Sequence, residues 1–216
     1  MDGIKAELPQ TTRLVAVSKF HPTEAIKEAY DAGQRIFGES RVQELENKRT
    51  VLPKDIEWHF IGHLQTNKVK YIAPYISMVH AVDSYRLLDE INRQAAKRDR
   101  TIPCLLEIHI AQEETKYGLT PDECTQMLGE GKWKELKNIS ISGIMGMATN
   151  TDNEAIIEKE FATLENYFKE LKSTVFKEYE PFKELSVGMS DDYRIAIRHG
   201  STFVRIGSRI FGTRNY

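Results

Sequence analysis

The sequence lacks the features that mark several large classes of protein. It has only two cysteines, Cys104 and Cys124, and no C-x-x-C motif, which excludes a zinc ribbon and a thioredoxin-like redox motif. No apolar run approaches the roughly 18 residues that a membrane helix needs. The first twelve residues do not combine a basic region with an apolar one, as a signal peptide would. We therefore expect a cytoplasmic protein with two buried free thiols.

An excess of charge of either sign is also missing. The chain has 30 basic and 32 acidic residues, which give a formal net charge of −2. Such a chain has no long-range attraction for nucleic acid or for an anionic membrane, so we expect neither as a partner. No linker rich in Pro, Gly or Ser and no low-complexity segment divides the 216 residues. The sequence predicts one domain over residues 1–216, large enough to bury its own core.

Short apolar runs alternate with amphipathic segments along the whole chain. Eight runs are typical of strands: Leu14–Ser18, Ile36–Phe37, Trp58–Ile61, Ile76–Val82, Ile102–Ile110, Ile139–Met147, Leu185–Val187 and Thr202–Ile206. They are mostly apolar, as parallel strands buried on both faces are. Eight strand–helix units favour a single (β/α)₈ TIM-type barrel. An open doubly wound sheet is the alternative, and no G-x-G-x-x-G motif follows the first run to support a dinucleotide-binding form of it.

Several local patterns predict where the intervening helices begin. Two helix starts carry the spacing of a capping box: Ser40 with Gln43, and Thr120 with Glu123. The clearest helix has one apolar stripe that steps by four and three residues from Ile157 to Val175.

Lys19 stands out because it directly follows the first predicted strand. Side chains alternate along a strand, so Val15, Val17 and Lys19 share a face. If this face is the barrel interior, Lys19 lies at the C-terminal rim, where barrel enzymes place reactive groups. Partial burial lowers the pKa of a lysine, and the neutral amine is a nucleophile toward aldehydes. The alternative is a strand-end lysine that reaches into water.

Two glycine–serine pairs follow the last two predicted strands. Barrels often bind phosphate with the loops after strands 7 and 8. Gly188–Ser190 follows the seventh strand, and Gly207–Ser208 follows the eighth. Glycine lets a phosphate approach the backbone, and serine adds a hydroxyl donor. For Ser190 the alternative is an ordinary helix N-cap.

Arg205 lies inside the apolar run of the eighth strand. A buried guanidinium without a partner is very costly, so Arg205 must contact either a ligand or a carboxylate inside the barrel. The histidines offer no comparable site. His59 and His63 are four residues apart in an extended segment, too far to share a metal ion, and we expect no metal.

Several segments together are similar to those of a known family. They are Leu14–Lys19 (LVAVSK), Phe37–Glu39 (FGE), Trp58–Gly62 (WHFIG), Leu64–Lys68 (LQTNK), Gly188–Asp192 (GMSDD), Gly200–Thr202 (GST), Val204–Gly207 (VRIG) and Ile210–Gly212 (IFG). The chain resembles the pyridoxal phosphate homeostasis protein family from about Leu14 to Tyr216. These are single-domain barrels similar to the N-terminal domain of bacterial alanine racemase.

The resemblance implies that the chain binds pyridoxal 5'-phosphate (PLP) as a Schiff base on Lys19. It places Arg205 opposite the pyridine nitrogen. It places Ser190, Gly207 and Ser208 around the phosphate. Lys116, in the loop after the fifth predicted strand, would lie near the ring, or is an ordinary loop lysine. The implied function is intracellular PLP homeostasis by buffering or delivery to apo PLP-dependent enzymes. We expect no robust turnover, because an arginine opposite the pyridine nitrogen makes the ring a poor electron sink. The absence of an obvious exposed apolar stripe favours a monomer.

Two other functions remain open from the sequence. One is a PLP-dependent racemase or decarboxylase of low activity, which would use the same cofactor residues. The other is a metal- or phosphosugar-dependent barrel enzyme that uses Lys19 as an aldolase does. The chain departs from the family pattern at Ser40, where asparagine is usual, so we expect no amide contact to the ring there. It also has only 13 residues before Leu14, and no second domain is expected to roof the site.

Overall fold

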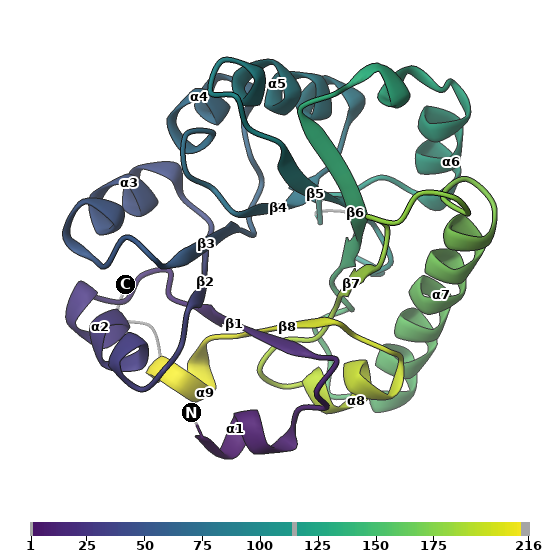
Figure 1. Ribbon diagram of the computed structural model, residues 1–216. Helices are drawn as coiled ribbons and strands as arrows, with labels where there is room; N and C mark the ends of the chain where they lie inside the picture. Colours follow the sequence, from purple (N-terminus) through teal and green to yellow (C-terminus); the bar gives the residue numbers. More distant parts are fainter. Residues whose placement is uncertain (1, 114–115, 213–216) are drawn as a thin grey trace.

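Eight parallel strands close into a barrel in the computed structural model, which describes residues 2–113 and 116–212. Each strand pairs with the next along the chain, and β8 pairs with β1. The strands are β1 (Arg13–Val17), β2 (Ile36–Glu39), β3 (Glu57–Phe60), β4 (Met78–Val82), β5 (Ile102–Ile108), β6 (Ile139–Gly146), β7 (Glu184–Ser186) and β8 (Phe203–Ile206). This closed ring (Figure 1) confirms the predicted (β/α)₈ barrel.

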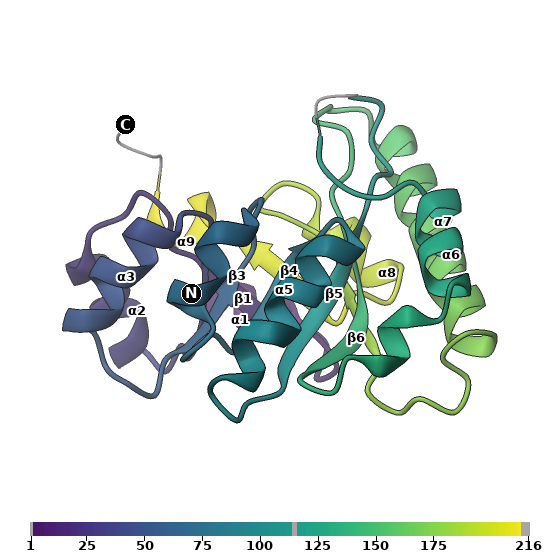
Figure 2. The ribbon, with the colours of Figure 1, turned by 90° about the horizontal axis from the view of Figure 1, so that it is seen from above.

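Helices surround the barrel and connect its strands (Figures 1 and 2). They are α2 (Thr23–Asp31), α3 (Val42–Val51), α4 (Val69–Ile72), α5 (Tyr85–Ala96), α6 (Pro121–Gly129), α7 (Glu154–Ser173) and α8 (Tyr193–Arg198), with short 3₁₀ helices at Thr66–Lys68 and Lys132–Glu135. Helix α1 (Asp2–Glu7) precedes β1, and α9 (Ser208–Phe211) follows β8. No helix in the described part of the chain is long and apolar enough to cross a membrane.

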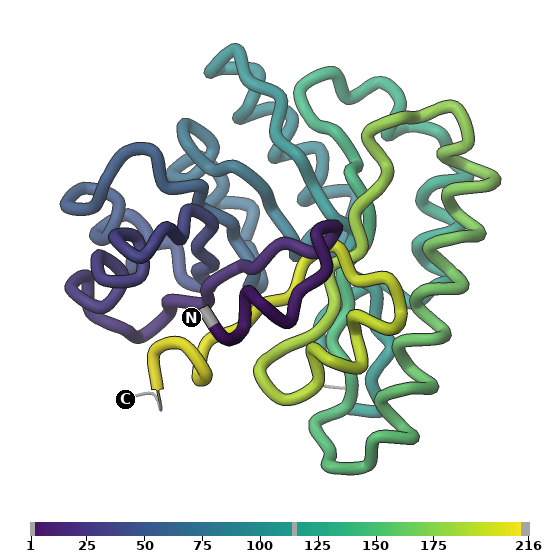
Figure 3. The backbone as a smooth tube through the Cα atoms, turned by 60° about the horizontal axis from the view of Figure 1, so that its bottom comes forward, coloured from purple at the N-terminus to yellow at the C-terminus, as the bar shows by residue number. Residues whose placement is uncertain are grey.

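Helix α1 packs beside β8 and α8, which come late in the chain, as the tube in Figure 3 shows. Ile4 belongs to an apolar cluster with Leu14 of β1 and Val204 of β8. Glu7 accepts hydrogen bonds from Tyr193 and Arg194 of α8. The first helix therefore ties β1 and β8 together on the outside of the barrel.

The core has an outer and an inner part. The larger apolar cluster fills the space between strands and helices and includes the buried free thiols of Cys104 and Cys124, as predicted. A smaller cluster fills the barrel interior: Val15, Met78, Ala81, Leu105, Met145 and Phe203. Val15 therefore points inward, as the sequence predicted. Above this apolar layer the interior becomes polar.

The predicted helix starts are only partly right. The Thr120–Glu123 capping box is present, with both of its hydrogen bonds. The Ser40–Gln43 box is wrong, because α3 begins at Val42 after Arg41 and has no side-chain cap. Ser40 is instead packed against the backbone of the β3–α4 loop, where a Cβ on Gly62 would lie 2.6 Å from the Ser40 Cβ.

The long helix α7 ends at Ser173, so the predicted stripe extends too far at Val175. The chain leaves the helix so that Phe176 turns into the core, where it stacks on Phe182 with 4.1 Å between ring centroids. The rest of the stripe, from Ile157 to Leu171, faces the barrel.

Candidate functional site

Lys19 lies in a tight turn just beyond the C-terminal end of β1 and is half-buried. The turn is closed by a hydrogen bond from the His21 N–H to the Ser18 carbonyl, with an N–O distance of 3.1 Å. Phe20 takes a positive φ of 67° within it, a conformation that is costly for a residue with a side chain. The turn therefore needs support from its surroundings.

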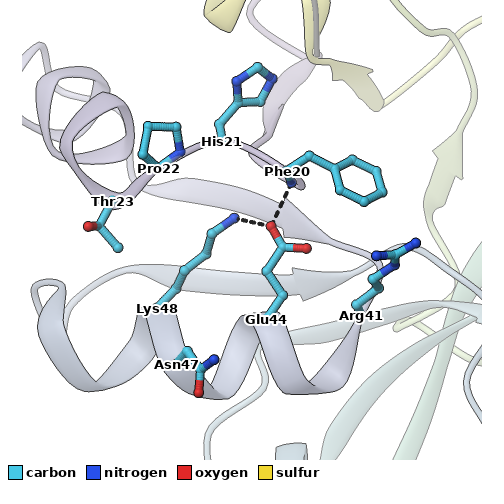
Figure 4. A pocket seen from close by; sticks show the side chains of 8 residues that line it. All are labelled: Phe20, His21, Pro22, Thr23, Arg41, Glu44, Asn47 and Lys48. Carbon is cyan, nitrogen blue, oxygen red and sulfur yellow. Dashed lines mark hydrogen bonds and ion pairs between the residues drawn. The ribbon is translucent and has the colours of Figure 1, made fainter. Parts of the chain in front are cut away.

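Three charged side chains from β2 and α3 supply that support. The Ser18 hydroxyl donates to Glu39 Oε1 at 2.6 Å. The Lys48 ammonium donates to the Ser18 carbonyl at 2.7 Å and to Glu39 Oε1 at 2.8 Å. Glu44 accepts from the Phe20 N–H and from Lys48, both at 2.6 Å, as Figure 4 shows. The residues on both sides of Lys19 are thus held by buried or partly buried charge-assisted hydrogen bonds, which are stronger than neutral ones.

Sequence reasoning missed Lys48 and Glu44. Both lie on the barrel-facing side of α3, and Lys48 is 5% exposed, near the buried Leu45. Burial raises the pKa of Glu39, while the adjacent Lys48 opposes that rise. The signal available in the sequence was a Glu–Lys pair spaced i, i+4 on the same helix face as an apolar residue. The two side chains line a groove of about 590 Å³ between α3 and the start of α2 (Figure 4).

The loops after β7 and β8 meet at the same rim. The Ser190 hydroxyl accepts a hydrogen bond from the Gly207 N–H at 3.3 Å. The alternative role of Ser190 as a helix N-cap is wrong, because α8 begins at Tyr193 and Asp192 is its N-cap residue. The Asp192 carboxylate turns back to accept from the Met189 N–H, and burial raises its pKa. The Asp192 carboxylate therefore forms its hydrogen bond within its own loop.

Two glycines let these loops pack closely. Gly188 has a φ of +95°, and a Cβ there would lie 2.6 Å from the Ala196 Cβ. A Cβ on Gly207 would lie 3.1 Å from the Val17 carbonyl oxygen. Ser208 begins the short helix α9 and is exposed. The Ser190 hydroxyl, the Gly207 N–H and Ser208 therefore lie close together at this rim.

Arg205 of β8 is 4% exposed inside the barrel. Its Nη1 donates to the Ser186 carbonyl and to the Ser186 hydroxyl, each at 2.7 Å, and its Nη2 donates to the Gly146 carbonyl at 3.0 Å. The alternative of a salt bridge inside the barrel is wrong, since no carboxylate of the described residues lies within 4.0 Å of its nitrogens. Burial lowers the pKa of Arg205 to about 10, against the opposing effects of Asp192 and Glu107. The guanidinium remains charged at neutral pH.

Two buried histidines extend this polar region deeper into the barrel. His80 Nδ1 lies 3.0 Å from the Ser186 hydroxyl, and His80 Nε2 lies 2.9 Å from His59 Nδ1. Burial lowers the pKa of His59 to about 3 and that of His80 well below its ordinary value. Both rings are therefore neutral. The sequence did not reveal this pair, whose members are 21 residues apart on β3 and β4.

Glu107 is a second unexpected group, buried near the C-terminal end of β5. It shares strand parity with Leu105 of the interior cluster. Its Oε2 has no hydrogen-bond partner in the parts of the chain that the structure describes. Burial raises the pKa of Glu107 to about 7, with the charge of Asp83 adding to the rise and that of Arg205 opposing it.

Lys116 lies in the loop after β5 and is half-buried. Its Nζ donates to the Ala148 carbonyl at 2.6 Å and lies 3.0 Å from Glu113 Oε1. Lys116 thus joins the loops after β5 and β6 at the C-terminal side of the barrel.

This donor set matches the chemistry of PLP. The primary amine of Lys19 suits the aldehyde. The two serine hydroxyls and the backbone N–H suit the phosphate, and the buried guanidinium suits the ring nitrogen. Gly188 and Gly207 let the loops that carry these donors pack against α8 and β1, where a Cβ would lie 2.6 Å from the Ala196 Cβ and 3.1 Å from the Val17 carbonyl oxygen.

Comparison with known proteins supports the same cofactor. The model of the alanine racemase N-terminal domain family matches residues 1–215. The pyridoxal phosphate homeostasis protein of Aquifex aeolicus is 38% identical over 206 residues, which cover 94% of this chain and 88% of the relative. That of Haemophilus influenzae is 39% identical over 210 residues, covering 95% and 86%. The chain belongs to the pyridoxal phosphate homeostasis protein family.

Solved structures of the family have the same barrel. PipY of Synechococcus elongatus without PLP superposes with a TM-score of 0.88 at 34% identity, covering 98% of this chain and 97% of PipY. A second PipY structure, with PLP bound, has a TM-score of 0.85 at 33% identity and the same coverage. Alanine racemase of Clostridium difficile, at 15% identity and a TM-score of 0.79, matches over 56% of its own chain and shares the fold alone.

Proposed function

We propose that this protein binds PLP at the C-terminal rim of its barrel and serves intracellular PLP homeostasis by buffering or delivering the cofactor. The observation that carries the proposal is the convergence of the Lys19 turn, the Ser190–Gly207 contact and Arg205 at one end of the barrel. Membership of the pyridoxal phosphate homeostasis protein family and the PLP-bound structure of PipY support it.

The described residues divide the binding task among them. When bound, PLP supplies an aldehyde whose carbon forms a C=N bond to a primary amine as water leaves. Lys19 supplies that amine, on a turn fixed by Glu39, Glu44 and Lys48. Ser190, Ser208 and the Gly207 backbone hold the phosphate. We place Lys116 near the ring at the same rim, where its ammonium also contacts Glu113 and the Ala148 carbonyl.

Arg205 argues for binding without sustained turnover. As the family resemblance implies, its charged guanidinium would face the ring nitrogen and would disfavour protonation of that nitrogen. An unprotonated pyridine is a poor electron sink, so carbanion chemistry on a bound amino acid is weak. We therefore propose that the protein is not an enzyme. Incubation of the PLP-loaded protein with L-alanine, with optical rotation followed over time, tests this, and sustained racemisation would establish the enzymatic alternative.

Cofactor uptake tests the binding proposal. PLP added to the purified protein should produce a visible absorbance band that depends on Lys19 and is absent from Lys19→Ala. Lys70→Ala, which removes an exposed lysine of α4, is the matched control and should leave the band unchanged. A protein that takes up no PLP, or a band of equal strength in Lys19→Ala, would refute the proposal.

We further propose that the protein acts in the cytoplasm as a monomer and passes PLP to apo PLP-dependent enzymes. Among the described residues the large exposed apolar side chains lie singly on different segments: Val51, Tyr71, Tyr117, Val175 and Met189. Such scattered residues do not make an interface. Light scattering tests the monomer. Delivery is tested by two rates. An apo enzyme mixed with the PLP-loaded protein should regain activity faster than the loaded protein releases PLP into buffer.

A further inference from the structure

A continuous polar chain crosses the barrel interior from β8 to β3. Arg205 Nη1 donates to the Ser186 hydroxyl at 2.7 Å. That hydroxyl lies 3.0 Å from His80 Nδ1, and His80 Nε2 lies 2.9 Å from His59 Nδ1. All four side chains are buried, and His80 is fully so. Four strands thus contribute one residue each to a single row of hydrogen bonds.

The proton positions along this chain follow from its chemistry. Arg205 has only N–H donors, so the Ser186 oxygen accepts from it. The one proton of the Ser186 hydroxyl then goes to His80 Nδ1, because His80 is the only acceptor for it among the hydrogen bonds of the described residues. A neutral His80 carries its proton on Nε2 and donates it to His59 Nδ1. His59 accordingly carries its own proton on Nε2.

The surroundings keep both rings neutral. Phe203 lies edge-on to His59 and to His80, with centroid distances of 5.4 and 5.5 Å. Arg13 lies over the Phe203 ring, and its positive charge acts on both histidines, as that of Arg205 does on His80. Two positive charges and burial together disfavour an imidazolium.

The chain replaces a counter-ion for Arg205. A carboxylate beside the guanidinium would offset its charge and compete for its N–H groups. Oriented neutral dipoles and the Ser186 and Gly146 carbonyls stabilise the cation while its charge is retained. The guanidinium is thereby fixed on the β6–β7 side of the interior.

We propose that His80 is a positioning residue, which orients the Ser186 hydroxyl and through it holds the Arg205 guanidinium toward the ring of the bound cofactor. This inference rests on the proposed function and adds to it a determinant of affinity and of the electronic environment of the ring. His59 acts one step further away, because its Nδ1 accepts a hydrogen bond from the His80 Nε2–H.

The chain itself is tested in the protein without cofactor. Proton–nitrogen NMR correlation of the histidine rings should show His80 and His59 neutral, with the proton on Nε2 in both, from pH 8 down to about pH 5, well above the lowered pKa values. A proton on His80 Nδ1, or an imidazolium in that range, would overturn the proposed direction of the chain.

The role toward the cofactor is tested by PLP titration of His80→Leu, with His80→Gln as the rescue variant. The leucine removes both hydrogen bonds, so the dissociation constant should rise by up to about tenfold, the upper end of the net contribution of a hydrogen bond between neutral groups. The absorbance maximum of the bound cofactor should also shift. The glutamine keeps one acceptor and one donor and should restore both properties.

Phe203→Leu is the matched control, because it alters packing against both rings without removing a hydrogen bond. It should lower stability and leave the absorbance maximum in place. An unchanged affinity and spectrum in His80→Leu, or the same spectral shift in Phe203→Leu, would overturn the positioning role. Failure of the unaltered protein to bind PLP would instead overturn the proposed function, and the NMR result on the chain would still stand.

Discussion

Lys19 shows what a single residue position tells and what it leaves open. Lys19 follows an apolar run and shares a strand face with Val15, which predicted a side chain at the C-terminal rim. The inward position of Val15 is consistent with this prediction. The turn that follows was not predictable, because the positive φ of Phe20 depends on Glu44, 24 residues later in the sequence. Local pattern thus located the amine, and long-range contacts fix it.

Loss of the amine should weaken cofactor binding without abolishing it. Lys19→Ala removes the proposed covalent link but leaves the proposed phosphate contacts of Ser190 and Gly207, each worth about 1.5–3 kcal/mol when charge-assisted. Equilibrium dialysis should therefore detect residual, weaker binding of PLP. Complete loss would mean that the loops after β7 and β8 do not hold the phosphate.

Glu107 predicts a pH dependence of stability. Its pKa is about 7 in the folded protein, against an ordinary 4.5, so the folded state binds more protons between these values. Stability contributed by this site is therefore highest below pH 4.5 and falls as the pH rises through 7. Glu107→Gln should raise the free energy of unfolding at pH 8 by up to about 3 kcal/mol and change it little at pH 4.5.

Urea unfolding of the cofactor-free protein at the two pH values measures this difference. Glu57→Gln, at an exposed position of β3, is the control and should show no such pH dependence. Equal effects of Glu107→Gln at both pH values would show that the carboxyl titrates normally.

At the scale of elements, the strand pattern was predictable and the helix starts were less so. The apolar runs located all eight strands, because a strand that is buried on both faces is apolar at nearly every position. The Thr120 cap was right, whereas Ser40 and Ser190 were wrong as caps. Both serines satisfy the local cap pattern but are used in contacts between loops, with Gly62 and Gly207. Such contacts depend on loops that are distant in sequence.

Helix α3 should depend on one buried ion pair to support the Lys19 turn. Lys48→Met removes the cation between Glu39 and Glu44 and leaves a fully buried carboxylate unpaired, which costs about 3 kcal/mol of stability. Weaker PLP binding should accompany the loss, because the carbonyl of Ser18 is also released. Urea unfolding and PLP titration measure the two effects.

Lys27→Met is the matched control for this substitution. Lys27 also forms an i, i+4 pair, with Asp31 at 2.7 Å, but both side chains are more than half exposed. An exposed pair contributes under about 1 kcal/mol. A loss of stability in Lys48→Met no larger than in Lys27→Met would contradict the supporting role of α3.

The closed barrel explains why the polar groups of its interior could not be predicted from the sequence. Eight strand–helix units predicted a closed barrel, because closure leaves no edge strand exposed. Which side chains meet inside depends on the offset between neighbouring strands. His59 pairs in register with Met78, and this offset brings its ring to His80. Glu107 and Arg205 likewise influence each other only after the barrel closes.

We propose that Lys19 holds PLP at the rim of the barrel. Borohydride reduction of the PLP-loaded protein, followed by peptide mapping, is the decisive experiment, because reduction makes the carbon–nitrogen bond permanent. We expect one modified residue, Lys19. Modification at Lys116 instead, or spread over exposed lysines with Lys19 unmodified, would show that Lys19 does not hold the cofactor.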